Sequence, residues 1–221
     1  MPRESIPLIR LGAFQQAEKL FILAYEGEQT EKKYFSVLRN SDLFNDSGII
    51  EIISLPRPKR VGTDPVSVKT VLKIAKSEYR FKDTDEFWLI VDRDHWEEKH
   101  NHSFDKIVED CEKEGNMFLA LSNPCFEIWI ILHFKDPKEI LEEEYSGILL
   151  NEKVGSKNYV SEYISKILEQ GRGYNKNPPS YLMLPKTKIA IERARGLDIS
   201  GEKYPKVVGT HVYKLIEKLI K

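Results

Sequence analysis

Four short, largely apolar segments alternate with helix-like segments over the first 135 residues of the chain. They are LFILAY (20–25), IIEIISL (49–55), EFWLIV (86–91) and NMFLAL (116–121). Strands that are apolar at successive positions have both faces buried, and strands separated by helices pair in parallel. We therefore expect an α/β fold, with a parallel sheet of about four strands flanked by helices and joined by right-handed connections.

Helix start signals occupy the gaps between these strands. Thr30 suits a helix cap, and Asp64 followed by Pro65 has the form of an N-cap with proline at the first helical position. Ser103 can cap a third helix. After the fourth strand, residues 125–134 (CFEIWIILHF) predict an apolar helix.

Beyond residue 134 the strand pattern ends, and the sequence predicts helices joined by loops. GRGYNKNPPSY (171–181) is rich in Gly, Pro and Asn, which is typical of a loop. We expect an N-terminal extension (1–19), an α/β core (20–135) and a helical C-terminal region (136–221) that packs on the core.

Composition is that of an ordinary globular protein. Of 221 residues, 41% are hydrophobic and 31% are charged, which is enough apolar material for a core. No apolar run approaches the roughly 18 residues of a membrane span, and the N-terminus lacks the pattern of a signal peptide. Two cysteines in a chain of this length predict free thiols and a cytoplasmic location, and they argue against a structural zinc.

Charge is unevenly distributed, although the formal net charge is −1. Residues 83–114 contain twelve acidic and four basic residues, and residues 151–221 contain fourteen basic and seven acidic ones. Such a chain could hold cations in one place and phosphates in another, but solvated helix surfaces give the same pattern. Candidate nucleic-acid contacts are Arg57, Lys59 and Arg60 and, interleaved with Tyr159, Tyr174 and Tyr181, the residues Lys153, Lys157, Arg172, Lys176, Lys186 and Lys188.

Carboxylates follow two of the predicted strands. Glu26 comes directly after the first strand, and Asp92 and Asp94 come directly after the third. Because ligands bind at the carboxyl ends of parallel strands, we expect these side chains to meet there. Oxygen-only ligands suit Mg²⁺ or Mn²⁺, and phosphodiester chemistry uses such ions. The alternative is a solvated turn that is acidic by chance.

Three motifs, in this order and spacing, resemble the RloB-like family: ILAYEGEQTEKKYF, FWLIVDRDHW and SNPCFEIWIILHF. The resemblance covers roughly residues 20–220 and implies a Toprim-type, Rossmann-like catalytic core. It implies that Glu26 serves as general acid or base and that Asp92 and Asp94 bind a divalent metal. Family members are bacterial and archaeal proteins of defence loci, often encoded beside an ATPase, so the resemblance also implies an ATPase partner.

Other side chains are candidates for the same site. Glu127, near the start of an apolar helix, either reaches the metal site as a catalytic group or interacts with the helix dipole, and we favour the site. Glu28 and Glu31 are either further metal ligands or ordinary exposed glutamates. A lysine often neutralises charge on the phosphate in metal nucleases, and Lys188, or Lys186, is the candidate here.

The expected function is that of a Mg²⁺- or Mn²⁺-dependent Toprim-like nuclease that hydrolyses DNA or structured RNA such as tRNA. It would be the effector of an antiviral or abortive-infection system working with an ATPase. The alternative is a catalytically silent module that binds nucleic acid or the ATPase and regulates a defence complex. A topoisomerase would need far more chain, and nothing indicates the zinc ribbon or template-binding segment of a primase.

Overall fold

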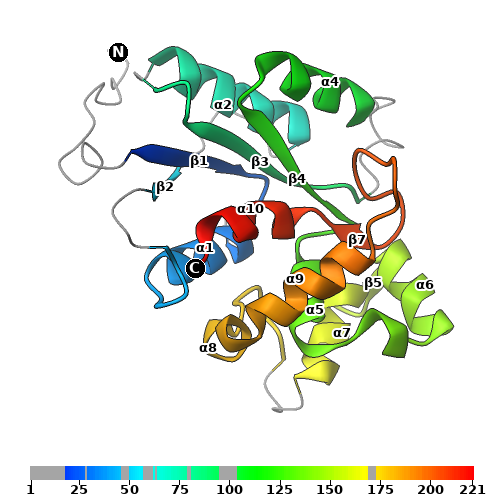
Figure 1. Ribbon diagram of the computed structural model, residues 1–221. Helices are drawn as coiled ribbons and strands as arrows, with labels where there is room; N and C mark the ends of the chain where they lie inside the picture. The colour runs from blue at the N-terminus through cyan, green and yellow to red at the C-terminus, as the bar shows by residue number, and fades with distance from the viewer. Residues whose placement is uncertain are drawn as a thin grey trace, which may run out of the picture.

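A five-stranded sheet forms the centre of the computed structural model (Figure 1), which describes residues 18–27, 29–45, 50–56, 62, 64–78, 81–94, 104–168 and 173–221. The strand order is β2-β1-β3-β4-β7. The first four strands are parallel, and β7 runs antiparallel to β4. Their bounds are β1 (Lys19–Tyr25), β2 (Ile50–Ser54), β3 (Glu86–Asp92), β4 (Met117–Asn123) and β7 (Gly209–Thr210). The expected α/β fold with a largely parallel sheet is confirmed.

Both faces of the sheet are buried, which explains the continuous apolar character of its strands. Successive side chains of a strand point to opposite faces. In β1, Phe21 and Leu23 belong to one buried cluster and Leu20 and Ile22 to the other, and all four are at most 1% exposed. Each face therefore needs its own cover of helices.

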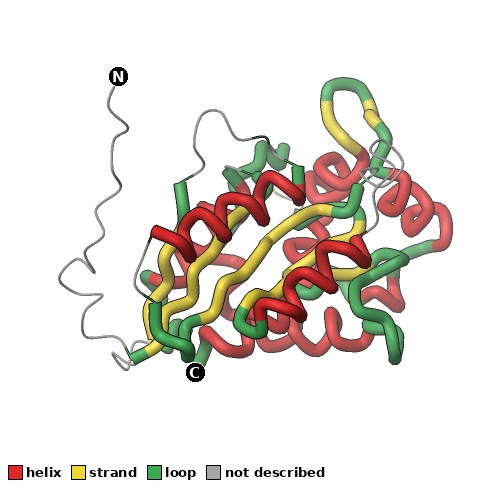
Figure 2. The backbone as a smooth tube through the Cα atoms, turned by 90° about the horizontal axis from the view of Figure 1, so that it is seen from above, coloured by secondary structure: helices red, strands yellow, loops and turns green. Residues whose placement is uncertain are grey.

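Helices cover the two faces unequally (Figures 1 and 2). On one face, α2 (Pro65–Glu78) and α4 (Phe104–Glu114) pack against the strands. The other face carries a thicker layer that includes helices from both ends of the chain. Its members are α1 (Thr30–Arg39), α5 (Glu127–Phe134), α9 (Thr187–Gly196) and α10 (Val212–Leu219). The helical C-terminal region thus shares a core with the sheet.

The C-terminal region also contains short strands, which the sequence did not predict. A hairpin of β5 (Lys153–Val154) and β6 (Lys157–Asn158) precedes α7, and β7 extends the central sheet. Strands of two residues are too short to show an alternating pattern. The other elements are η2 (Pro137–Glu139), α6 (Glu142–Leu150), α7 (Tyr159–Ile167), α8 (Ser180–Met183) and η3 (Leu184–Lys186).

The predicted helix caps have different outcomes. The side chain of Asp64 accepts hydrogen bonds from the backbone N–H groups of Val66 and Ser67 at 3.0 and 3.1 Å, so this N-cap is confirmed. The cap at Thr30 is wrong, because Thr30 is the first residue of α1 and its hydroxyl points elsewhere. Ser103 lies outside the described residues. None of the helices in the described ranges is long and apolar enough to cross a bilayer.

Candidate functional site

Glu26 and Asp92 lie where the strand order reverses. The chain passes from β1 outward to β2 and then returns to place β3 on the other side of β1. Such a switch leaves a crevice beyond the carboxyl ends of the two strands, where α/β proteins bind ligands. The backbone N–H of Asp92 donates to Glu26 Oε2 at 2.8 Å, and the backbone N–H of Glu26 donates to the Ile90 carbonyl at 2.9 Å. The fold therefore brings together the two carboxylates that the sequence placed at strand ends.

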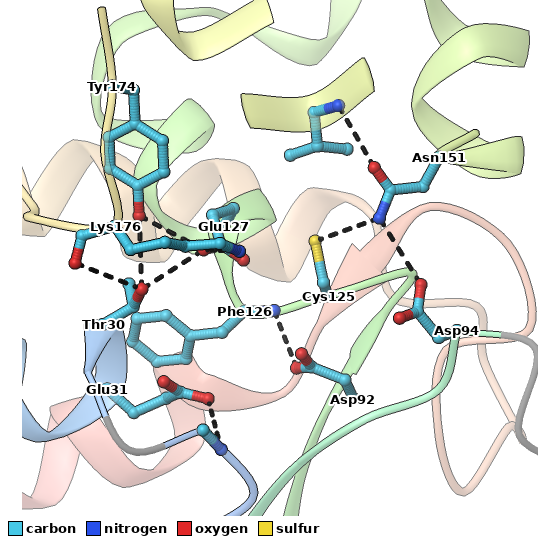
Figure 3. Close-up of polar contacts among 12 residues, drawn as sticks. Thr30, Glu31, Asp92, Asp94, Cys125, Phe126, Glu127, Asn151, Tyr174 and Lys176 are labelled. Atoms are coloured by element: carbon cyan, nitrogen blue, oxygen red, sulfur yellow. Dashed lines mark hydrogen bonds and ion pairs between the residues drawn. The ribbon is translucent and has the colours of Figure 1, made fainter. Parts of the chain in front are cut away.

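The end of β3 and the turn after it hold the two aspartates of the Asp-Arg-Asp motif (Figure 3). Asp92 Oδ1 accepts a hydrogen bond from the backbone N–H of Phe126 at 2.8 Å. The backbone N–H of Asp94 donates to the Pro124 carbonyl at 2.8 Å, and Asp94 has a positive φ of 35°. The segment before α5 thus fixes the Asp-Arg-Asp turn. Arg93 points away from the site, with Nη1 2.6 Å from the Lys206 carbonyl.

Gly27 allows the Glu31 carboxylate to fold back against the chain. The backbone N–H of Gly27 donates to Glu31 Oε1 at 3.1 Å, and Glu31 is only 4% exposed. A Cβ atom at residue 27 would overlap both carboxylate oxygens. Glu31 is therefore a buried member of the site and not an ordinary exposed glutamate of the first helical turn.

Glu127 is buried at the start of α5 and accepts three hydrogen bonds on one oxygen (Figure 3). Its Oε1 lies 2.6 Å from Lys176 Nζ, 3.2 Å from the Tyr174 hydroxyl and 3.3 Å from the Thr30 hydroxyl. The Tyr174 and Thr30 oxygens are themselves 3.4 Å apart. The cost of burying this carboxylate is thus offset by an ion pair and two hydroxyl groups.

Asn151 connects the site to the C-terminal region. It ends α6 in the left-handed conformation, with φ 45°. Its Nδ2 lies 3.4 Å from Asp94 Oδ1 and 3.8 Å from Cys125 Sγ, while its Oδ1 accepts from the backbone N–H of Val160 at 3.1 Å. Asn151 therefore links Asp94 to the start of α7.

Burial and mutual repulsion raise the pKa values of these carboxyl groups. Burial raises the pKa of Glu26 to about 8, and the charges of Glu31 and Asp94 add to the rise against the hydrogen bond from the Asp92 amide. Burial also raises the pKa of Asp92 well above its usual value, reinforced by Glu31 and Glu26. The pKa of Glu31 is raised mainly by burial and further by the charge of Glu127. Without a ligand, the site therefore favours the protonated form of Glu26, Glu31 and Asp92 at neutral pH.

The chemistry of these donors fits a hard dication. In the part of the chain that the structure describes, no three Asp, Glu, His or Cys side chains are arranged as a ready-made metal site. The donors at the sheet edge are nevertheless all oxygens, which is what Mg²⁺ and Mn²⁺ prefer. A dication among them would favour the ionised form of Glu26 and Asp92, against the burial and mutual repulsion that raise the pKa values of these two groups. Glu26, Asp92 and Asp94 are the side chains that would hold it.

The candidate nucleic-acid contacts are dispersed. Lys186 lies over the ring of Phe134, with 4.8 Å from Nζ to the centroid, at the far end of α5 from Glu127. Lys188 is exposed on α9, and no hydrogen bond or ion pair among the described residues links it to the carboxylates. Lys157 lies beside Gly173, at the beginning of the 173–179 loop. Of the candidates, Glu28, Arg57, Lys59, Arg60 and Arg172 lie outside the described residues.

Sequence reasoning missed two of the contacts that build this site. Lys176 was predicted only as one of several backbone-following lysines, and Asn151 was not singled out. One signal was present, because a glutamate in an apolar helix, such as Glu127, needs a partner. This predicts that a cation or a hydrogen-bond donor lies beside it but does not identify the residue. Because Lys176 is 49 residues from Glu127, the pairing becomes visible only in the fold.

Comparison with known proteins identifies the family. No match was found among curated proteins or among solved structures. The family model for RloB-like protein matches residues 21–219, which is most of the chain and includes every carboxylate described above. The chain therefore belongs to the RloB-like family.

Proposed function

We propose that this protein is a Mg²⁺- or Mn²⁺-dependent, Toprim-like nuclease that hydrolyses phosphodiester bonds in DNA or in structured RNA such as tRNA. The observation that carries the proposal is the pairing of Glu26 with Asp92 at the switch point of the sheet. Two half-buried carboxylates held together at that place oppose folding unless they serve a ligand. Phosphodiester hydrolysis uses such carboxylates to hold a dication and to move a proton.

The chain's own groups supply the proton transfer in this scheme. Glu26 is the carboxyl group at the switch point to which the family resemblance gives the role of general acid or base, and its carboxylate form can accept a proton. A water oxygen bonds to phosphorus, the bond from phosphorus to the leaving oxygen breaks, and the proton of the water passes to Glu26. The leaving oxygen takes its proton from solvent. A dication held by Glu26, Asp92 and Asp94 would stabilise the charge on the attacking and leaving oxygens.

Cleavage assays with purified protein test the proposal. Plasmid DNA and total tRNA are incubated with Mg²⁺, Mn²⁺ or EDTA, using the wild type, Glu26→Gln, Asp92→Asn and the control Glu143→Gln. Glu143 is an exposed residue of α6. Its substitution changes the net charge by the same amount as the site substitutions but leaves the site intact. We expect metal-dependent cleavage by the wild type and the control, and at least about a 100-fold loss in the site variants. Equal cleavage by all four proteins would contradict the assignment.

We extend the proposal to an antiviral setting with an ATPase partner, on the strength of the family resemblance. The two cysteines, Cys111 and Cys125, are free and buried, which suits the reducing cytoplasm. Co-expression with a candidate ATPase encoded beside this protein, followed by co-purification, tests the partnership. A stable complex without metal-dependent cleavage in any state would favour the alternative, a regulatory module.

A further inference from the structure

Lys176 is the cation that meets the carboxylate site. Its Nζ lies 2.6 Å from Glu127 Oε1. Glu127 is one of the buried carboxylates of the site, so this ion pair links Lys176 to the site. The charge of Glu127 in turn acts on Glu31 and Asp92, so the ammonium group stands at the border of the whole set. Its position therefore matches that of a group that would meet the substrate of these carboxylates.

The backbone fixes this lysine from both sides. Lys176 has a positive φ of 63°, and its carbonyl oxygen lies 3.5 Å from the Thr30 hydroxyl, which can donate either to it or to Glu127 Oε1. Two residues earlier, the backbone N–H of Tyr174 is bonded to Ser165 Oγ at 2.8 Å, and the Tyr174 hydroxyl reaches Glu127. The 173–179 loop is thus anchored to α1, α5 and α7, and the lysine side chain starts from a defined place.

The ion pair is asymmetric in its exposure. The Glu127 side chain is 3% exposed, whereas that of Lys176 is 50% exposed. An ammonium group has three N–H donors, and Glu127 Oε1 takes one of them. The solvent-facing side of Lys176 can therefore donate to a second acceptor while the first contact is kept. A lysine whose only task was to neutralise Glu127 would not need this exposed face.

We propose that Lys176 is the phosphate-contacting residue of the site, with its ammonium group donating to a non-bridging oxygen of the scissile phosphodiester while Glu127 holds it in place. This inference rests on the proposed nuclease function. The contact strengthens as negative charge builds up on the phosphate during attack, so it stabilises the transition state more than the ground state. The expected phosphate-neutralising lysine is thus Lys176, in place of Lys186 or Lys188.

Kinetics of Lys176→Met and Lys176→Arg test the inference, with Lys113→Met as the matched control. Lys113 is exposed in the last turn of α4, next to the amino end of β4 and hence at the opposite edge of the sheet. We expect Lys176→Met to lose about 100-fold in kcat, Lys176→Arg to retain part of the activity because it keeps the charge, and the control to match the wild type. Unchanged kcat in Lys176→Met overturns the inference.

Two further measurements separate phosphate contact from a structural ion pair. Binding of tRNA in Ca²⁺ is measured against salt concentration, and loss of one phosphate contact lowers the slope of log K against log salt by about one. Mn²⁺ affinity without nucleic acid should stay the same or rise in Lys176→Met, because a positive charge beside the carboxylates has gone. An unchanged slope together with weakened Mn²⁺ binding would mean that Lys176 only supports the carboxylates, which overturns the inference.

The double variant Lys176→Met/Glu127→Gln covers the case in which the single variant fails to fold. It removes both partners, so no unpaired charge is left buried. If it folds and its salt slope is still about one lower than that of Glu127→Gln alone, the inference holds; if the two slopes are equal, it fails. If the wild type cleaves and all Lys176 variants have the same kcat and salt slope as the wild type, this inference alone is refuted. A wild type that neither cleaves nor binds nucleic acid refutes the proposed function as well.

Discussion

Replacing Glu26 by glutamine should stabilise the folded protein at pH 8 and weaken its response to Mg²⁺. The substitution is nearly isosteric, and the glutamine oxygen can still accept the hydrogen bond that the Asp92 amide donates at 2.8 Å. The substitution therefore removes the charge and keeps the contact. This separates the electrostatic cost of the site from its packing.

The sign and size follow from the pKa of Glu26. Burial, with the charges of Glu31 and Asp94, raises this pKa from 4.5 to about 8. The unfolded chain releases the proton near pH 4.5, whereas the folded protein keeps it until about pH 8. Between these values the folded state binds more protons, so the free energy of unfolding decreases as the pH rises. The full shift corresponds to about 5 kcal/mol, which is the largest gain that the substitution can bring at pH 8.

Urea unfolding at pH 4.5 and pH 8, in EDTA and in Mg²⁺, measures the effect. In EDTA, Glu26→Gln should have a higher free energy of unfolding than the wild type. The difference between the two proteins should be several times larger at pH 8 than at pH 4.5. Mg²⁺ should stabilise the wild type more than the variant, because an ion that binds only the folded state adds to its stability. The control Glu143→Gln should show neither effect. A variant that is equally or less stable at pH 8 than the wild type would refute the reasoning.

Three further changes probe the surroundings of the site. Gly27→Ala should displace the Glu31 carboxylate and lower the free energy of unfolding, measured in urea, by about 1–3 kcal/mol. If the double variant Gly27→Ala/Glu31→Ala is no more stable than Gly27→Ala alone, the contact with Glu31 is not the cause of the loss. Asn151→Ala should lower the free energy of unfolding by about 1–2 kcal/mol and should also lower the Mn²⁺ affinity measured by calorimetry. Asn151→Gly should lose mainly the Mn²⁺ affinity, because glycine tolerates the φ of 45° at this position. Burial raises the pKa of Cys111 to about 11 and raises the pKa of Cys125 well above its usual value. Both thiols should therefore react slowly with a thiol reagent until urea is added, and rapid reaction of the native protein would rule out their burial.

The core sheet could be predicted because its strands are covered on both faces. The expected segments at 20–25, 49–55, 86–91 and 116–121 each agree with an observed parallel strand to within about two residues. In contrast, β7 (Gly209–Thr210) joins the sheet through only two residues. β7 lies between α9 and α10, so its pairing depends on how these two helices pack on the sheet. No local pattern in the sequence predicts that packing.

The carboxylate half of the site was predictable, and the cationic half was not. A carboxylate directly after a parallel strand is placed by topology alone, so Glu26 and Asp92 could be expected to meet. The position of Lys176 depends on a loop whose Gly, Pro and Asn residues allow many conformations. Tertiary contacts with Glu127 and Thr30 select one of them. Such contacts arise from the packing of the C-terminal region, which the sequence of the loop does not encode by itself.

The fold holds the site against its own repulsion by using main-chain amides. Glu26 accepts from the amide of Asp92, Asp92 from the amide of Phe126, and Glu31 from the amide of Gly27. Asp92 ends β3, Phe126 directly precedes α5, and Gly27 lies in the short connection between β1 and α1, so main-chain groups next to the sheet and helices fix the carboxylates. Preorganisation of this kind lowers the cost of reorganising the site when a ligand binds, and it leaves the ligand-free protein less stable than an uncharged site would. The increase in the free energy of unfolding that Glu26→Gln brings at pH 8 therefore measures how much stability the ligand-free protein loses by keeping this carboxyl group in the site.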